Sequence, residues 1–239
     1  AAPAGPPAGA LALPDLDEDG RPESLWLAPA RLGTAVKLAS TNHGGHTHDV
    51  LVTIGLPAGQ LVGPPAGPWT LAGGALTARL LRPPGGRPPE LVVSGGERAK
   101  RFVHLERGFL KLDAREVVPG FSAGLIMLGD DRATLAQLAA APTAAGAWTL
   151  PLAPPIAFDL GFDTQDRVVR ITTREGSLTT RGGVGVGDAA ASLAVPLPGT
   201  RVGADWRSPR YGMIARIGKD ERVQELVIAR PWQEQGKPD

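Results

Sequence analysis

Glycine and proline interrupt this chain so often that short strands and many turns are its expected architecture. The 239 residues include 32 glycines and 24 prolines, close to a quarter of the total. Glycine supplies the backbone conformations that tight turns need, and proline removes a hydrogen-bond donor from any regular element. A chain of this length suits two modest domains rather than one minimal core.

The central part of the sequence predicts antiparallel β structure. Trp69–Ala72 and Ala75–Ala78 flank Gly73-Gly74, and Leu91–Val93 and Phe102–Leu105 flank a Ser-Gly-Gly turn, so both pairs are expected to form hairpins. We therefore expect a mainly β fold, in which an antiparallel β sandwich is followed by an α+β tandem repeat module. The expected domains are a Pro/Ala/Gly-rich tail with an acidic loop (1–24), the sandwich (25–118) and the repeat module (119–239).

An internal repeat marks the C-terminal half. Leu128-Gly129-Asp130 recurs 58 residues later as Val186-Gly187-Asp188, and Trp148 recurs at the same offset as Trp206. After a three-residue deletion, Asp166-Arg167-Val168 matches Glu221-Arg222-Val223. The units span about 124–173 and 183–228, and each is interpreted as a glycine turn, a short helix, a Trp and a hairpin. Strand alternation would place Val168, Arg170 and Thr172 on one face, and Val169, Ile171 and Thr173 on the other.

This tandem unit resembles the helix-plus-sheet repeats of β-lactamase inhibitory proteins and of small outer-membrane assembly lipoproteins. The resemblance covers roughly residues 120–232 and implies a sheet surface that grips another protein, such as an envelope protein partner. The alternative is that Trp148 and Trp206 are core anchors of each unit and nothing more.

Composition excludes several classes of function. The net charge is +1 with no basic face, which argues against nucleic-acid binding, and no apolar run approaches the ~20 residues of a membrane span. The first residues, Ala1-Ala2-Pro3, fit a start left by signal-peptide cleavage, which predicts export to the periplasm or outer cell envelope. A cytosolic chain that has lost a tag is the alternative. Because there is no cysteine, any metal must be held by nitrogen and oxygen ligands.

An acidic loop precedes the first apolar strand. Asp15, Asp17, Asp19 and Glu23 place oxygens at loop positions one, three, five and nine, and Gly20 stands at position six. This pattern predicts a calcium site, because calcium prefers oxygen ligands and the glycine permits the tight turn. The loop resembles the D-x-D-x-D-G-x-x-[DE] calcium loops of bacterial extracellular repeats, and it departs from the EF-hand at position twelve, where Trp26 stands. An acidic, solvated turn is the alternative.

Histidines form the second candidate metal site. His43, His46 and His48 fall within six residues, and His104 lies in a later predicted strand. Residues two apart on a strand point the same way, so His46 and His48 could converge on one ion, and Gly44-Gly45 would let the backbone swivel to bring in His43. Imidazole ligands suit copper or zinc, with copper ahead in the usual order of affinity. Asp49 could orient a ligand ring from outside the coordination sphere.

The run His43-Gly-Gly-His46-Thr-His48-Asp49 is similar to the H-G-x-H-x-H-E segment of copper–zinc superoxide dismutases. Phe102-Val103-His104-Leu-Glu106 resembles the context of that family's late copper ligand. The resemblance implies that His46, His48 and His104 bind copper, that His43 is the remaining candidate for a fourth ligand, and that the fold is a Greek-key sandwich or barrel. Four histidines cannot form separate copper and zinc sites, so the resemblance implies a copper-only version.

Two functions follow as hypotheses. The first is an exported copper-binding protein, in its sharpest form a copper-only superoxide dismutase that acts on superoxide or a small anion. The arginine that would guide the anion is not assigned; Arg101, Arg107 and Arg115 lie nearby in sequence. The alternative is a non-enzymatic interaction subunit of an envelope assembly, which binds its partner through the C-terminal repeat.

Overall fold

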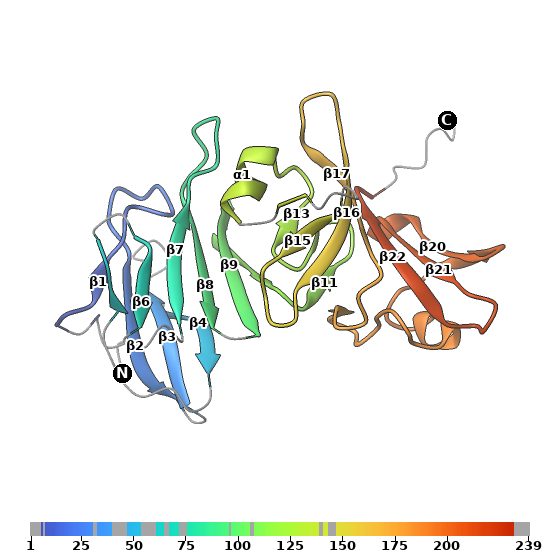
Figure 1. The fold of residues 1–239 in the computed structure, drawn as a ribbon, viewed down its shortest axis with the longest axis horizontal. Helices are drawn as coiled ribbons and strands as arrows, with labels where there is room; N and C mark the ends of the chain where they lie inside the picture. Colours follow the sequence, from blue (N-terminus) through green and yellow to red (C-terminus); the bar gives the residue numbers. More distant parts are fainter. Residues whose placement is uncertain are drawn as a thin grey trace. The chain divides into compact units, whose positions relative to one another are not determined.

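The computed structural model divides the chain into two compact units, Ala1–Asp113 and Ala114–Asp239 (Figure 1). It describes residues 6, 8–30, 33–39, 47–53, 61–64, 67–71, 76–95, 97–105, 108–138, 141–142 and 147–231. The fold is mainly β, as the frequency of glycine and proline predicts. Among the described helices, none combines the length and the apolar character that a membrane crossing requires.

The first unit contains two antiparallel sheets. One has the strand order β1-β2-β3-β4, and the other has the order β10-β9-β8-β7-β6-β5. The strands of the first sheet are β1 (Leu11–Ala12), β2 (Ser24–Ala30), β3 (Gly33–Ala39) and β4 (Thr47–Thr53). The strands of the second are β5 (Leu61–Val62), β6 (Trp69–Leu71), β7 (Thr77–Leu81), β8 (Glu90–Gly95), β9 (Arg98–Leu105) and β10 (Gly108–Asp113). Both expected hairpins are present, since β6 pairs with β7 and β8 pairs with β9.

One hydrophobic core joins the two sheets of this unit. Leu25, Val36 and Leu38 from the first sheet share a buried cluster with Leu91 and other residues of the second, including Trp69, Val93 and Phe102. Strand β4 also lies against β8 and β9. This packing of apolar faces is consistent with the expected β sandwich.

A buried ion pair lies within the second sheet. The Arg101 Nε donates to Glu90 Oε2 at 2.6 Å, and the two side chains are 0% and 3% exposed. Arg101 is opposite Val92 in the pairing of β8 with β9. A buried charge of this kind persists because its partner compensates the loss of water.

The second unit combines a small sheet with a large one. The small sheet has the order β13-β12-β11-β18 and contains a parallel pair, β11 with β18. Its strands are β11 (Glu116–Val118), β12 (Ser122–Ala123), β13 (Ile126–Met127) and β18 (Thr179–Thr180). The only described α-helix is α1 (Arg132–Gln137), which begins after Asp131, whose side chain accepts a hydrogen bond from the Thr134 N–H.

The large sheet has eight antiparallel strands in the order β14-β15-β16-β17-β22-β21-β20-β19. Its first half comprises β14 (Ala141–Pro142), β15 (Trp148–Leu150), β16 (Ile156–Phe162) and β17 (Val168–Thr173). Its second half comprises β19 (Thr200–Val202), β20 (Asp205–Ser208), β21 (Met213–Ile217) and β22 (Val223–Ala229). Two 3-10 turns, η1 (Ala190–Leu193) and η2 (Pro209–Tyr211), complete the unit.

The two halves of this sheet carry the same backbone contacts, at the 58- and 55-residue offsets found in the sequence. Gly129 and Gly187 have φ angles of +94° and +95°. Their N–H groups donate to the carbonyls of Val168 and Val223, at 2.7 Å in both cases. Further along each half, Asp166 and Glu221 share a left-handed conformation, with φ of 57° and 56°. The repeated sequence therefore produces repeated structure.

The halves meet at a local pseudo-twofold axis. Thr172 of β17 pairs with Val227 of β22, and these two residues occupy equivalent positions 55 residues apart. The strand order accordingly reads the same from either end of the sheet. Because the repeats pair through equivalent strands, one continuous sheet replaces two separate modules.

The expected α+β character of the repeat module is wrong. Where the sequence suggested a helix in each unit, the structure has the six-residue α1 in the first and the four-residue 3-10 turn η1 in the second. Both segments are short because glycine-rich turns precede them and a turn or strand follows within a few residues. Helices this short gain little hydrogen bonding for the entropy of nucleation, so the sheets dominate the unit.

A β-bulge also changes the expected alternation along β17. Gly161 is opposite Arg170, whereas Phe162 is opposite Val168, so Val169 is the extra residue. Val168 is consequently buried while Arg170 is exposed, although they lie two apart. The second half repeats this bulge at Gln224, between Val223 and Glu225. An inserted residue reverses the period-two pattern, which strand alternation alone does not reveal.

Removing one partner of the buried ion pair should destabilise the first unit strongly. We expect Arg101→Met to lower the free energy of unfolding by about 3–5 kcal/mol, because Glu90 is left buried and charged. The double variant Glu90→Gln/Arg101→Met should lose less, since no buried charge is left alone. Urea denaturation measures both.

The control for this prediction is Arg201→Met, which breaks an exposed pair with Glu221. Exposed ion pairs contribute little to stability because water screens them, so this variant should stay close to the parent protein. Equal losses in the Arg101 and Arg201 variants would contradict the compensating role of Arg101.

Candidate metal centre

The acidic loop connects the first two strands of the chain. Leu11 and Ala12 of β1 pair with Leu25 and Ser24 of β2, and the Leu13 N–H donates to the Glu23 carbonyl at 2.8 Å. Residues 14–22 therefore project from a closed hairpin. Hydrogen bonding at the base of the loop holds its two ends together.

Apolar side chains fix this loop on the hydrophobic core. Leu13 and Leu16 are 3% and 1% exposed and belong to the cluster shared by both sheets of the first unit. Leu16 lies between Asp15 and Asp17, so its burial draws the neighbouring carboxylates toward the protein. Asp17 and Glu23 are themselves buried, whereas Asp15 and Asp19 are half-buried.

Side-chain hydrogen bonds within the loop shape the turn. Asp15 Oδ2 accepts from the Gly20 N–H at 2.7 Å, and Asp19 Oδ1 accepts from the Arg21 N–H at 2.8 Å. Gly20 has φ of +85°, a left-handed conformation that glycine adopts without strain. No atom lies within 4 Å of a Cβ built at Gly20, so the backbone conformation explains the glycine better than lack of space does.

Four carboxylates converge inside this turn. One oxygen from each of Asp15, Asp17, Asp19 and Glu23 lies within 4.8 Å of the others. These are the four residues that the spacing in the sequence singled out as calcium ligands. The turn brings them together because each aspartate side chain bends back over the loop backbone.

Glu23 is the exceptional member of the cluster. Its side chain is 1% exposed, and Oε2 accepts a hydrogen bond from the Leu16 N–H at 2.5 Å. Its other oxygen, Oε1, is buried and has no hydrogen-bond partner among the described residues. Burial is the main cause that raises the pKa of Glu23 to about 8, the Leu16 hydrogen bond opposes the rise, and the charges of Asp17 and Asp15 add to it.

The chemistry of this cluster suits calcium. Four carboxylates are hard oxygen donors, and calcium accepts six to eight oxygens at ~2.3–2.6 Å in a flexible geometry. Oxygens on opposite sides of such an ion lie ~4.6–5.2 Å apart. The four ligand atoms here lie within 4.8 Å of one another, so all four can bind the same calcium ion. Copper favours nitrogen and sulfur ligands that this loop does not offer.

The structure describes only part of the histidine set. His43 and His46 lie outside the described residues, as do 40–42, 44 and 45. His48 lies on β4 opposite Leu38, and Asp49 lies opposite Lys37; the structure describes only their backbone. His104 lies on β9, where its ring meets the edge of Phe109 at 5.8 Å between centroids. The copper site therefore stays a prediction.

The arginines near the histidine segments have other environments. Arg101 is fully buried in its ion pair with Glu90, so it cannot meet an incoming anion at the surface. Arg115 is half-buried and donates to the Ala153 carbonyl at 3.5 Å. Arg107 lies outside the described residues.

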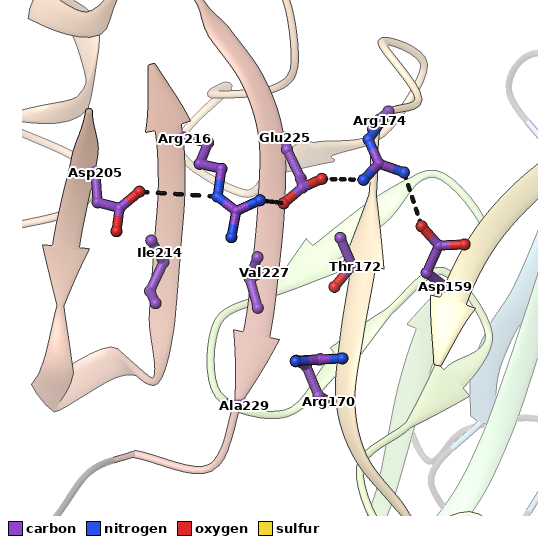
Figure 2. A pocket seen from close by; sticks show the side chains of 10 residues that line it. All are labelled: Asp159, Arg170, Thr172, Arg174, Asp205, Ile214, Arg216, Glu225, Val227 and Ala229. Atoms are coloured by element: carbon purple, nitrogen blue, oxygen red, sulfur yellow. Dashed lines mark hydrogen bonds and ion pairs between the residues drawn. The ribbon is translucent and has the colours of Figure 1, made fainter. Parts of the chain in front are cut away.

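A hollow on the large sheet of the second unit has no counterpart in the sequence reasoning. It measures about 450 Å³ and is lined by charged and apolar side chains from both repeats (Figure 2). The sequence gives little indication of this hollow, because the residues that line it come from several strands that are separated along the chain. Charged residues within otherwise apolar strand segments, such as Asp159, Arg170 and Arg216, are its only trace in the sequence.

Comparison with known proteins returns no matching family model, no matching curated protein and no matching solved structure.

The pKa of Glu23 predicts how stability depends on pH in calcium-free buffer. Because the folded-state pKa of about 8 exceeds the ordinary value of 4.5, the folded protein holds this proton more tightly than the unfolded chain does. The Glu23 contribution to folding stability should be full below pH 4.5 and should be lost as pH rises toward 8. The slope should reach up to about 1.4 kcal/mol per pH unit. Chelator-treated protein unfolded by urea at several pH values measures it.

Glu23→Gln provides the control for this pH dependence. The amide keeps the size of the side chain and does not titrate, so this part of the pH dependence should vanish. At pH 8 in chelator, the variant should be more stable than the parent by on the order of 1–3 kcal/mol, because no buried charge remains. A parent and variant with the same pH profile would show that Glu23 is ionised at ordinary pH.

Proposed function

We propose that this chain is an exported calcium-binding β protein, in which the ion fixes the first hairpin to the core of the N-terminal unit. The observation that carries the proposal is the buried, unpartnered Oε1 of Glu23 inside a cluster of four carboxylates. None of the described protein atoms compensates the charge on this oxygen, and a bound divalent cation would do so. The two parts of this proposal, export and calcium binding, are compatible, because calcium is abundant outside the cytoplasm and extracellular sites of ~10⁻⁴–10⁻³ M affinity suffice there.

The loop gives the bound ion a structural role. Leu13 and Leu16 lie in the core beside the ligands, and the Leu13 N–H bonds to the backbone of Glu23. Calcium would therefore neutralise Asp17 and Glu23 at the same place where β1 joins the sheet. In the absence of calcium, repulsion among the carboxylates opposes the burial of both leucines.

Calcium should stabilise this protein by binding the folded state. We expect an increase of about 2.7 kcal/mol in the free energy of unfolding when calcium is present at 100 times its dissociation constant. The gain should grow between pH 5 and pH 8, because binding requires Glu23 to lose its proton. Calorimetry with and without calcium, together with direct titration, measures both quantities.

Two variants make the calcium experiment specific. Asp17→Ala/Asp19→Ala removes two ligands and should abolish the calcium-dependent gain. Asp163→Asn/Asp166→Asn removes two charges from an exposed acidic turn in the second unit and should retain the gain in full. A calcium effect that persists in the first variant would refute the proposed site.

A copper site is a second candidate function, in its sharpest form a copper-only superoxide dismutase. Strand β4 lies against β9, so the strands that carry His48 and His104 are neighbours in the first unit. That arrangement favours the hypothesis that imidazoles from both strands share an ion. Calcium and copper would then occupy separate sites, one with oxygen ligands and one with nitrogen ligands.

Copper binding and dismutase activity test this second candidate together. The parent protein should bind one copper ion per chain, and His46→Ala/His48→Ala should lose the copper and the activity while keeping its calcium-dependent stability. Metal analysis and a superoxide dismutation assay on both proteins decide the matter. Activity that survives the double substitution, or no copper in the parent protein, would remove the copper hypothesis.

A further inference from the structure

The hollow on the second unit lies on the open face of the large sheet, at the pseudo-twofold axis. Thr172 and Val227, the equivalent residues that pair across the axis, both line it. The opposite face of these strands is apolar, with Ile171, Leu226 and Ile228 fully buried. The hollow is therefore formed by side chains that the core does not use, and about 450 Å³ is enough for a small ligand.

One edge of the hollow is a row of alternating charges in which every member is paired (Figure 2). Arg174 binds Asp159 at 2.7 Å and also contacts Glu225. Arg216 binds Glu225 at 3.0 Å and approaches Asp205 at 3.8 Å. Two guanidinium groups thus serve three carboxylates, and Glu225 at the centre is buried. This row leaves no arginine free for a ligand.

Arg170 stands apart from that row. Its guanidinium forms no hydrogen bond or ion pair within the part of the second unit that the structure describes, and Figure 2 shows it below the paired charges. The side chain lies along Gly161: a Cβ built there would be 3.3 Å from Arg170 Cβ and 3.4 Å from its Nε. The absent side chain at Gly161 therefore gives the arginine its position over β16.

The opposite side of the hollow is apolar. Ile214, Val227 and Ala229 line it, and Figure 2 shows Val227 and Ile214 in a row across the strands from Thr172. The Thr172 hydroxyl has no hydrogen bond to another described residue, so it offers one polar group between the apolar side chains and Arg170. A guanidinium, a hydroxyl and an aliphatic patch therefore lie together in one hollow.

Charge balance restricts the ligand. The lining contains three arginines (Arg170, Arg174, Arg216) and three carboxylates (Asp159, Asp205, Glu225). The row of two arginines and three carboxylates carries one net negative charge, which Arg170 balances, so the second charge of a dianion such as phosphate would have no guanidinium to meet. A carboxylate carries a single charge and matches the fork of one guanidinium in a bidentate contact.

We propose that this hollow binds an aliphatic monocarboxylate, with the carboxylate on Arg170 and the branched hydrocarbon against Ile214, Val227 and Ala229. The same chemistry is presented by a free short-chain acid and by the C-terminal residue of a peptide. The two sources differ in the amide that precedes a C-terminal residue, for which the Thr172 hydroxyl is a hydrogen-bond partner.

The test uses N-acetyl-leucine and 4-methylpentanoate as probes, with N-acetyl-leucinamide as the uncharged control, on the full chain. We expect dissociation constants on the order of 0.1–10 mM, as one charge-assisted contact and a small apolar surface allow. Amide chemical shifts of Arg170, Thr172 and Ala229 should move with either acid and stay unchanged with the uncharged control. If only N-acetyl-leucine binds, the ligand is the C-terminal residue of a peptide. If both acids bind, the hollow also accepts free short-chain acids.

Three variants decide whether Arg170 holds the carboxylate. Arg170→Gln should weaken binding of the acids at least tenfold. Gly161→Ala keeps Arg170 but displaces its side chain, so this variant should weaken binding several-fold. Arg181→Gln, which removes an exposed arginine paired with Glu116 outside the hollow, should bind as the parent does. The proposal is overturned if neither acid binds, if Arg170→Gln binds as well as the parent, or if phosphate or the uncharged control binds more tightly than N-acetyl-leucine.

Discussion

A carboxylate removed from water must be compensated, and the three buried glutamates among the described residues differ in how fully they meet that requirement. Glu90 forms a direct ion pair with Arg101 inside the first unit, and Glu225 is held between Arg174 and Arg216 on the second. Glu23 has a backbone N–H for one oxygen and no described partner for the other. Because the energetic cost of an uncompensated buried charge is large, this third case is where an external cation is most needed. The raised pKa of Glu23 has the same cause: because the buried charge is costly, the folded protein favours the protonated carboxyl group.

The second unit depends on the pairing of β17 with β22. This pairing converts a repeated sequence into one sheet with a pseudo-twofold axis. Equivalent residues on the core face are buried in both repeats, as Ile171 and Leu226 show. The open face has diverged: Arg170 in the first repeat corresponds to Glu225 in the second, and Asp159 corresponds to Ile214. Equivalent positions that are free of core packing have acquired different chemistry, and the hollow owes its polar and apolar sides to that divergence.

The two proposed sites belong to different units and use different physics. The calcium loop relies on carboxylates close together in sequence, and its free energy comes from neutralising charge that the fold has buried. The hollow relies on side chains from several strands, and its selectivity comes from one guanidinium left over after the other charges have paired. The proposed calcium site belongs to the N-terminal unit and the proposed carboxylate site to the large sheet of the C-terminal unit, and neither proposal requires an enzymatic activity.

The sequence by itself determined the features that depend on near neighbours. The spacing of Asp15, Asp17, Asp19 and Glu23 identified the convergent cluster, because nine residues and one glycine turn suffice to bring the four together. The offset of the repeats and the pairing of β6 with β7 followed in the same way. Only the tertiary structure decided that Glu23 is buried without a full set of partners, because that depends on how Leu13 and Leu16 pack against a second sheet. It also decided the bulges at Val169 and Gln224, the reduction of the expected helices to short segments, and the isolation of Arg170, since the pattern of residues along the chain does not reveal the register of strand pairing or where a guanidinium finds a partner.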